Sequence, residues 1–151
     1  GLHAGFGMQY LEGRLYVLHN PKYTRFSDDG RERTDLIAQT LPKPWALDWN
    51  DHVPANFRLG LDGFVYVAVG DKGLFGCRGR DGSAAELRGG GILRMTPDAE
   101  RLEVAATGVR NILDVAMNAE GDLFTYDNTD ELARIRGDLA KNGFDVAVIK
   151  F

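Results

Sequence analysis

The fold is decided by residues 58–67, which read RLGLDGFVYV. Apolar and polar residues alternate on both sides of an Asp-Gly pair, and an acidic residue followed by glycine between two alternating runs is a signal for a β-hairpin turn. The same pattern recurs at residues 8–17, MQYLEGRLYV, and at residues 115–125, VAMNAEGDLFT. The turn glycines of the three copies are Gly13, Gly63 and Gly121. The sequence therefore predicts a repeated β-hairpin at intervals of 50 and 58 residues.

Further short strands are expected between these hairpins. In the first interval they are residues 23–27 and 33–39, separated by a turn at Asp28-Asp29-Gly30. In the second interval they are residues 91–95 and 102–106, separated by a turn at Thr96-Pro97-Asp98. Four antiparallel strands in roughly 50 residues make one blade of a β-propeller. The sequence thus predicts an all-β fold of about two and a half to three four-stranded blades.

A ring needs at least about four blades. We therefore expect this chain to be part of a larger ring, or to close its ring with another copy. The blades are expected over residues 1–131. Residues 132–151 do not continue the pattern and are expected to be a divergent tail, truncated or non-native; weakly helix-friendly composition is confined to residues 130–142.

The composition is that of a folded globular chain, with 44% hydrophobic and 26% charged residues. The net charge is −4, which disfavours general binding of nucleic acid. No apolar run approaches the roughly 20 residues of a membrane-spanning helix. Cys77 is the only cysteine, so no internal disulfide is possible, and we expect it to be a small core residue rather than a reactive thiol.

Polar residues recur in one position of the repeat, ten or eleven residues before each turn glycine. These residues are His3, His52 and the pair Arg110-Asn111. Residues just before the innermost strand of a blade lie at one mouth of the central channel, so these side chains are expected to converge on one site. An Arg-Asn pair in a loop between apolar strands favours binding of a polar ligand. The alternative is that they only cap strand ends or bind water.

Acidic loops follow two of the predicted inner hairpins. Asp71 lies in the first, and the second contains Asp127, Asn128, Asp130 and Glu131. The closely spaced oxygen donors of the second loop suit Ca²⁺ better than zinc, although a solvated acidic loop or Asx turn explains them equally well. Residues 89–91 are three glycines, but no Gly-Lys-Ser/Thr follows and a strand comes next, so crowding of the backbone explains them better than a phosphate loop.

Several of these pieces occur together in a known family. They are Asn50-Asp51-His52, residues 58–73 (RLGLDGFVYVAVGDKG), residues 90–95 (GGILRM) and residues 106–111 (ATGVRN). In this order and spacing they resemble the soluble quinoprotein glucose/sorbosone dehydrogenase family, and most closely the membrane-bound dehydrogenase-like proteins of planctomycete-type bacteria. The resemblance covers roughly residues 1–131.

The resemblance implies a six-bladed propeller that holds pyrroloquinoline quinone (PQQ) and Ca²⁺ at one mouth and oxidises a sugar or alcohol. His52 would be the general base on the substrate hydroxyl, and hydride would pass to the quinone. Arg110 would stabilise negative charge on the quinone oxygen, with Asn111, His3 and Asp71 contacting the cofactor. The calcium loop would fall at residues 127–131, with Asp127, Asn128, Asp130 and Glu131 as ligands.

The resemblance also implies a periplasmic or extracellular location and a cytochrome as electron acceptor. Two other readings stay open. One is a propeller of the NHL or gluconolactonase type, whose axial polar residues hold a ligand or a metal without a redox step. The other is a scaffold fragment that is inactive by itself, since part of a ring lacks part of the channel wall.

Overall fold

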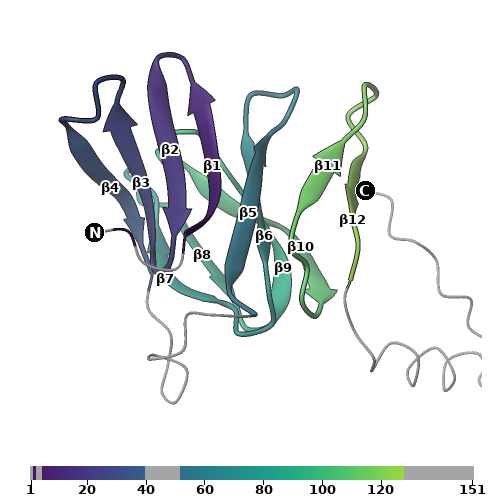
Figure 1. Cartoon of the computed structure of the whole chain (residues 1–151). Coiled ribbons are helices and arrows are strands. Elements are labelled where there is room, and N and C mark those ends of the chain that lie inside the picture. The colour runs from purple at the N-terminus through teal and green to yellow at the C-terminus, as the bar shows by residue number, and fades with distance from the viewer. Residues whose placement is uncertain (1, 3–4, 40–51, 128–151) are drawn as a thin grey trace, which may run out of the picture.

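The computed structural model describes residues 2, 5–39 and 52–127, which form β-strands and turns (Figure 1). No helix occurs among these residues. His3, the loop residues Asn128, Asp130 and Glu131, the segment 130–142 and the tail 132–151 lie outside the described residues. The all-β fold class predicted from the repeat is confirmed.

The first blade is a four-stranded antiparallel meander in the order β1-β2-β3-β4. Its strands are β1 (Gly5–Leu11), β2 (Arg14–His19), β3 (Lys22–Ser27) and β4 (Arg33–Ala38). The turn between β1 and β2 places Gly13 at φ +76° with nothing within 4 Å of an added Cβ, so its left-handed backbone rather than lack of space requires glycine. The predicted hairpin and both predicted outer strands are thus confirmed.

The second blade has the same order with one insertion. Its strands pair in the order β10-β9-β6-β5 and are β5 (Pro54–Leu59), β6 (Val65–Val69), β9 (Gly90–Met95) and β10 (Leu102–Val109). A separate hairpin, β7 (Leu74–Arg78) and β8 (Ala84–Leu87), is inserted between β6 and β9. This hairpin was not predicted, although Asp81-Gly82 is the same acidic-Gly turn signal as in the three repeats.

The third blade is represented by the hairpin β11 (Val115–Met117) and β12 (Leu123–Thr125). The first strands of the three blades are neighbours, since β1 contacts β5 and β5 contacts β11. Figure 1 shows these strands succeeding one another across the molecule while the later strands of each blade extend away from them. Successive antiparallel blades with adjacent first strands form the arrangement of a partial β-propeller.

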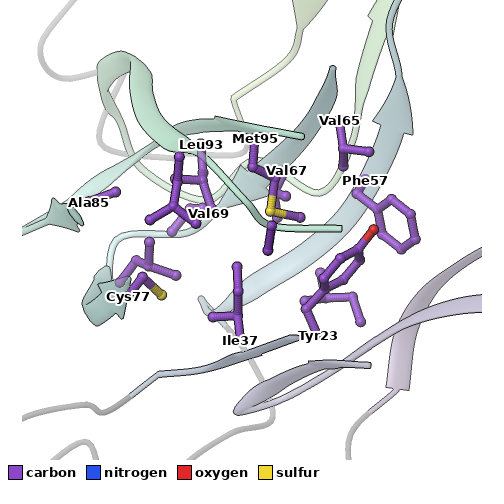
Figure 2. Close-up of a cluster of buried hydrophobic side chains, with 14 of the residues drawn as sticks. Tyr23, Ile37, Phe57, Val65, Val67, Val69, Cys77, Ala85, Leu93 and Met95 are labelled. Carbon is purple, nitrogen blue, oxygen red and sulfur yellow. The ribbon is translucent and has the colours of Figure 1, made fainter. Parts of the chain in front are cut away.

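The blades are held together by side chains that alternate along each strand. We call the face that a blade turns toward the next blade its trailing face, and the opposite face its leading face. The trailing face of blade 1 contributes Tyr16, Leu18 and Tyr23 to a core whose other half is the leading face of blade 2, including Phe57 and Val67. The rings of Tyr23 and Phe57 meet edge to face at 5.3 Å (Figure 2). A second core joins the trailing face of blade 2 to the leading face of blade 3.

The apolar composition of these cores follows from the alternation, because every second residue of a strand points to the same face. In β6 all five residues are buried, since both of its faces are covered by neighbouring blades. Cys77 lies in the first core, and burial raises the pKa of its thiol to about 12. The prediction that Cys77 is a core residue and not a reactive thiol is consistent with this environment.

A chain of buried polar groups stabilises blade 1. Thr24 Oγ1 donates to Asp35 Oδ1 at 2.7 Å, and His19 Nε2 lies 2.7 Å from Thr24 Oγ1, so the imidazole is the donor in that contact. Asn20 Nδ2 donates to the carbonyl oxygen of Pro54 at 2.8 Å, which ties blade 1 to the first residue of β5. The paired groups explain how His19 and Thr24 are tolerated with almost no exposure.

Replacing Phe57 by alanine is expected to lower the free energy of unfolding by about 3–5 kcal/mol, because the ring is fully buried and its loss leaves a cavity between two blades. Urea denaturation followed by circular dichroism measures this. Leu61→Ala is the control, since Leu61 is exposed in the β5–β6 turn and should change stability by less than about 0.5 kcal/mol. Equal effects of the two substitutions would contradict the packing described here.

Acid is expected to destabilise the protein through His19. Burial, and then the positive charges of Arg33 and Lys22, lower the pKa of His19 below its ordinary 6.5, while Asp35 opposes the shift. The unfolded chain therefore binds this proton more readily, so the contribution is complete above pH 6.5 and is lost as the pH falls below it. Urea midpoints between pH 7.5 and 5.0 should fall less steeply in His19→Gln than in the unsubstituted protein; identical slopes would rule out this role.

Candidate functional site

The loop that follows β6 lies against His52 and Val53, the two residues that precede β5. The amide of Lys72 donates to the carbonyl oxygen of His52 at 2.9 Å, and the amide of Gly70 donates to that of Val53 at 3.3 Å. A Cβ on Gly70 would meet the Cα and carbonyl carbon of His52 at 2.7 and 2.5 Å, so only glycine permits this approach. The start of one strand and the end of its neighbour are thereby fixed together at one end of blade 2.

Asp71 joins two of the polar residues that the repeat singled out. Its Oδ1 lies 2.5 Å from Nδ1 of His52, and its Oδ2 lies 3.5 Å from Nε of Arg110. The three side chains are partly exposed, with 21% of the His52 side chain accessible. They are therefore held in place by one another and still accessible to a ligand.

His52 has a left-handed backbone conformation, with φ at +53°. This region is uncommon for residues other than glycine, although histidine is among the types that occur in it more often. Backbone conformations of this kind are concentrated at functional sites, where surrounding contacts impose them. Here the contacts from the Gly70–Lys72 loop impose it.

Arg110 and Asn111 lie in the connection between β10 and β11, which is fixed by Asp127. The two carboxylate oxygens of Asp127 accept the backbone amides of Arg110 at 2.9 Å and Asn111 at 3.0 Å. Asp127 follows β12, so the end of one strand again holds the segment that precedes its neighbour. The Oδ1 atom of Asn111 is buried and has no hydrogen-bond partner, which leaves an acceptor available to a bound group.

The predicted crowding at the three glycines explains how Arg110 is placed. A Cβ on Gly90 would lie within 3.0 Å of the carbonyl oxygens of Val109 and Arg110, and one on Gly91 within 3.0 Å of the carbonyl of Ala106. Gly89 has nothing within 4 Å of its added Cβ. The backbone that carries Arg110 therefore packs directly on β9, and the predicted crowding is confirmed for Gly90 and Gly91 but not for Gly89.

The structure brings together five of the residues predicted for the site, and one of them, Asp71, links two of the others. His52, Asp71 and Arg110 are in contact through their side chains, and Asp127 binds the backbone of Arg110 and Asn111. The contact of Asp71 with a cofactor stays a prediction; in the structure its carboxylate contacts His52 and Arg110. Its bridging role could have been expected from sequence only by pairing the loop after each β-hairpin with the segment before it.

The predicted calcium loop is only partly within the described residues. Asp127 is described, and both of its carboxylate oxygens accept backbone amides. Within residues 2, 5–39 and 52–127, no group of three or more His, Cys, Asp or Glu side chains is arranged to hold a metal ion. The role of Asp127 in the described structure is therefore to position the Arg110-Asn111 segment.

The Asp71 carboxylate orients the His52 imidazole. A carboxylate at Nδ1 favours the tautomer with its proton on Nδ1, which leaves the lone pair of Nε2 directed away from Asp71. Arg110, at the other carboxylate oxygen, places a permanent positive charge beside this pair.

Gly90→Ala is expected to destabilise the protein by more than about 1 kcal/mol, because the added methyl group collides with backbone carbonyl oxygens that cannot move as a flexible side chain could. Gly89→Ala is the matched control, one residue away and with open space around its added Cβ, and should be tolerated. Thermal denaturation of both variants tests this. A Gly90→Ala protein as stable as Gly89→Ala would show that β9 does not position Arg110.

Comparisons with known proteins bear on the family and not on the reaction. No curated protein matches the chain. A solved structure described as a "putative gluconolactonase" has a TM-score of 0.40 and 16% identity, over 85% of this chain and 57% of that one. The chain thus spans little more than half of that neighbour. Among the described residues there is no helix long and apolar enough to cross a membrane. Residues 2–144 match the family described as "Domain of unknown function (DUF7133)", so the chain belongs to that family.

Proposed function

We propose that this partial propeller binds a small polar molecule at the His52–Asp71–Arg110 site and removes a proton from a hydroxyl group or a water molecule there. The observation that carries the proposal is the single carboxylate of Asp71, which contacts both the imidazole and the guanidinium. One acid thereby fixes a base and a cation side by side in a partly accessible position. A site that only capped strand ends would not require both groups to share one acid.

His52 would act as the base. Asp71 holds its ring orientation and tautomer, and the loop contacts to the His52 backbone keep the imidazole from turning away. A positioned general base of this kind contributes about 10²–10⁴-fold to a reaction in which a hydroxyl loses its proton.

Arg110 would stabilise the negative charge that develops when the proton leaves. A guanidinium beside a developing oxyanion acts most strongly in a site partly shielded from water, and this residue is about two-thirds buried. The partnerless Oδ1 of Asn111 would accept a hydroxyl of the ligand or bind a cation.

Oxidation by a quinone is the first reaction that this arrangement could serve, as the resemblance to quinoprotein dehydrogenases implies. In this version Arg110 would contact an anionic or quinone oxygen of PQQ, and the amide oxygen of Asn111 would offer one hard donor to Ca²⁺. When bound, PQQ supplies a carbon that accepts hydride. The chain itself would contribute the base, His52, and the cation, Arg110. A sugar or alcohol substrate and a cytochrome acceptor belong to this version of the proposal, as does an exported location.

Hydrolysis is the second reaction, because the same base could deprotonate water. Arg110 would then stand beside the carbonyl oxygen of an ester or lactone, where negative charge forms in the tetrahedral intermediate. The His52–Asp71 pair suits hydrolysis as well as oxidation, because an imidazole oriented by a carboxylate can accept a proton from a water molecule or from a substrate hydroxyl. This version needs no redox cofactor.

The test compares PQQ binding with lactone hydrolysis. The protein is titrated with PQQ in the presence and absence of Ca²⁺ by absorbance and calorimetry, and it is assayed separately for dye reduction with aldoses and for acid release from lactones. Arg110→Ala should weaken ligand binding about 10- to 100-fold, because a charge-assisted contact is lost. His52→Gln should abolish turnover while leaving binding largely unchanged.

Arg80→Ala and Asp98→Asn are matched controls, since they remove an equivalent exposed ion pair outside the site. Saturable PQQ binding with dye reduction lost in His52→Gln supports oxidation. Lactone hydrolysis lost in His52→Gln without PQQ binding supports hydrolysis. No binding and no turnover in a well-folded protein would refute the proposed site.

A further inference from the structure

Three consecutive carbonyl groups fix the segment that carries His52. Two of them, those of His52 and Val53, accept backbone amides of the loop that follows β6, in the same blade. The third, that of Pro54, accepts Nδ2 of Asn20 at 2.8 Å. Asn20 follows the last residue of β2 and therefore belongs to blade 1. The start of β5 is thus held by a side chain of the preceding blade as well as by its own blade.

Asn20 is a fully buried side chain whose two polar atoms are both used. Its exposed fraction is 0%, and its Oδ1 accepts Nε2 of Gln39 at 3.1 Å. A carbonyl oxygen can only accept a hydrogen bond, so the contact with Pro54 requires the amide nitrogen of Asn20 on that side. Its oxygen must then face Gln39. The orientation of the Asn20 side chain is therefore determined by these two neighbours.

The pair formed by Asn20 and Gln39 is costly for packing alone. Gln39 is buried, and its Oε1 has no hydrogen-bond partner. A buried acceptor that has lost water and gained no partner costs free energy, whereas apolar side chains of the same shape would avoid that cost. Apolar residues surround the same place, since Leu18, Ile37 and Leu74 line one small cavity together with Gln39. A polar pair in these surroundings indicates a role in fixing position rather than in adding stability.

The next blade boundary has a contact of the same kind. There the loop after β6 reaches the segment that precedes β11, through Asp71 and Arg110. Asn20 lies in the corresponding loop, after β2, and reaches the first residue of β5. In both cases the loop after the second strand of one blade contacts the start of the next blade. His52 lies between these two contacts, tied to Asn20 through Pro54 and to Arg110 through Asp71.

We propose that Asn20 is a positioning residue for the His52–Asp71–Arg110 site. By holding the Pro54 carbonyl, Asn20 keeps the two preceding residues in the conformation in which the His52 ring meets Asp71, including the left-handed backbone of His52. A shift of blade 1 relative to blade 2 is transmitted to the imidazole through this bond, because only one residue separates Pro54 from His52. The packing of the two blades thereby regulates the geometry of the site. The inference rests on the proposed function, since it assigns Asn20 to that site.

Nuclear magnetic resonance of the imidazole nitrogens tests the proposal without requiring turnover. The sequence has three histidines, and His52→Gln assigns the His52 signals by their loss. At alkaline pH, where imidazoles are neutral, the His52 proton is expected on Nδ1, facing Asp71. Asn20→Leu keeps the shape of the side chain and removes the donor, so it should move the His52 nitrogen shifts toward those of a free imidazole. Gln39→Leu should move them less and in the same direction, because Asn20 keeps its contact but loses the group that orients it.

Thr24→Val is the matched control. Thr24 is fully buried in the same blade and its hydroxyl contacts His19 and Asp35, so this substitution should lower the melting temperature and leave the His52 signals in place. His52 signals that are unchanged in a folded Asn20→Leu protein would overturn the proposal. Equal shifts in Asn20→Leu and Thr24→Val would also overturn it, because they indicate a general loss of stability.

Gln39→Leu decides by the same criterion if Asn20→Leu does not fold. The result is separate from that of the activity tests. A protein without turnover can still show the coupling of His52 to Asn20, which would refute only the proposed chemistry. An active protein whose His52 signals are the same with and without Asn20 would refute only the positioning role.

Discussion

The contact between blade faces is the constraint on which the rest of this structure depends. Phe57, at the centre of the first interface, has no accessible surface and meets Tyr23 of the preceding blade edge to face. Because neighbouring blades cover both faces of β6, its two alternating sets of residues are all apolar and all buried. Each blade is thus a sheet whose stability depends on its neighbours.

The candidate site depends on strand pairing as well as on blade packing. When the first two strands of a blade pair, the loop after the second strand meets the segment before the first, and the packing of neighbouring blades adds the contact between Asp71 and Arg110. Asp71 uses this juxtaposition to hold His52 and Arg110, and Asp127 uses it to hold the backbone of Arg110 and Asn111. The acidic residues after the strands thereby position the basic residues before them.

Glycine makes these close approaches possible at two points with different physical causes. Gly70 and Gly90 have no room for a side chain, because backbone atoms of His52 and Arg110 occupy that space. Gly13, by contrast, has open space and is needed for its left-handed backbone. Replacing Gly70 or Gly90 would displace the backbone that carries the site residues, whereas replacing Gly13 would strain the β1–β2 turn.

The sequence by itself determined the blade repeat, the hairpin turns, the faces of the strands and the position of the polar residues within the repeat. These are local properties, since an acidic-Gly turn and a period of two act over a few residues. Only the tertiary structure decided that Asp71 bridges His52 and Arg110 and that Asp127 binds backbone amides. The reason is that these partners are 16 to 39 residues apart in the chain and meet only when strands pair and blades pack, which no short-range pattern encodes.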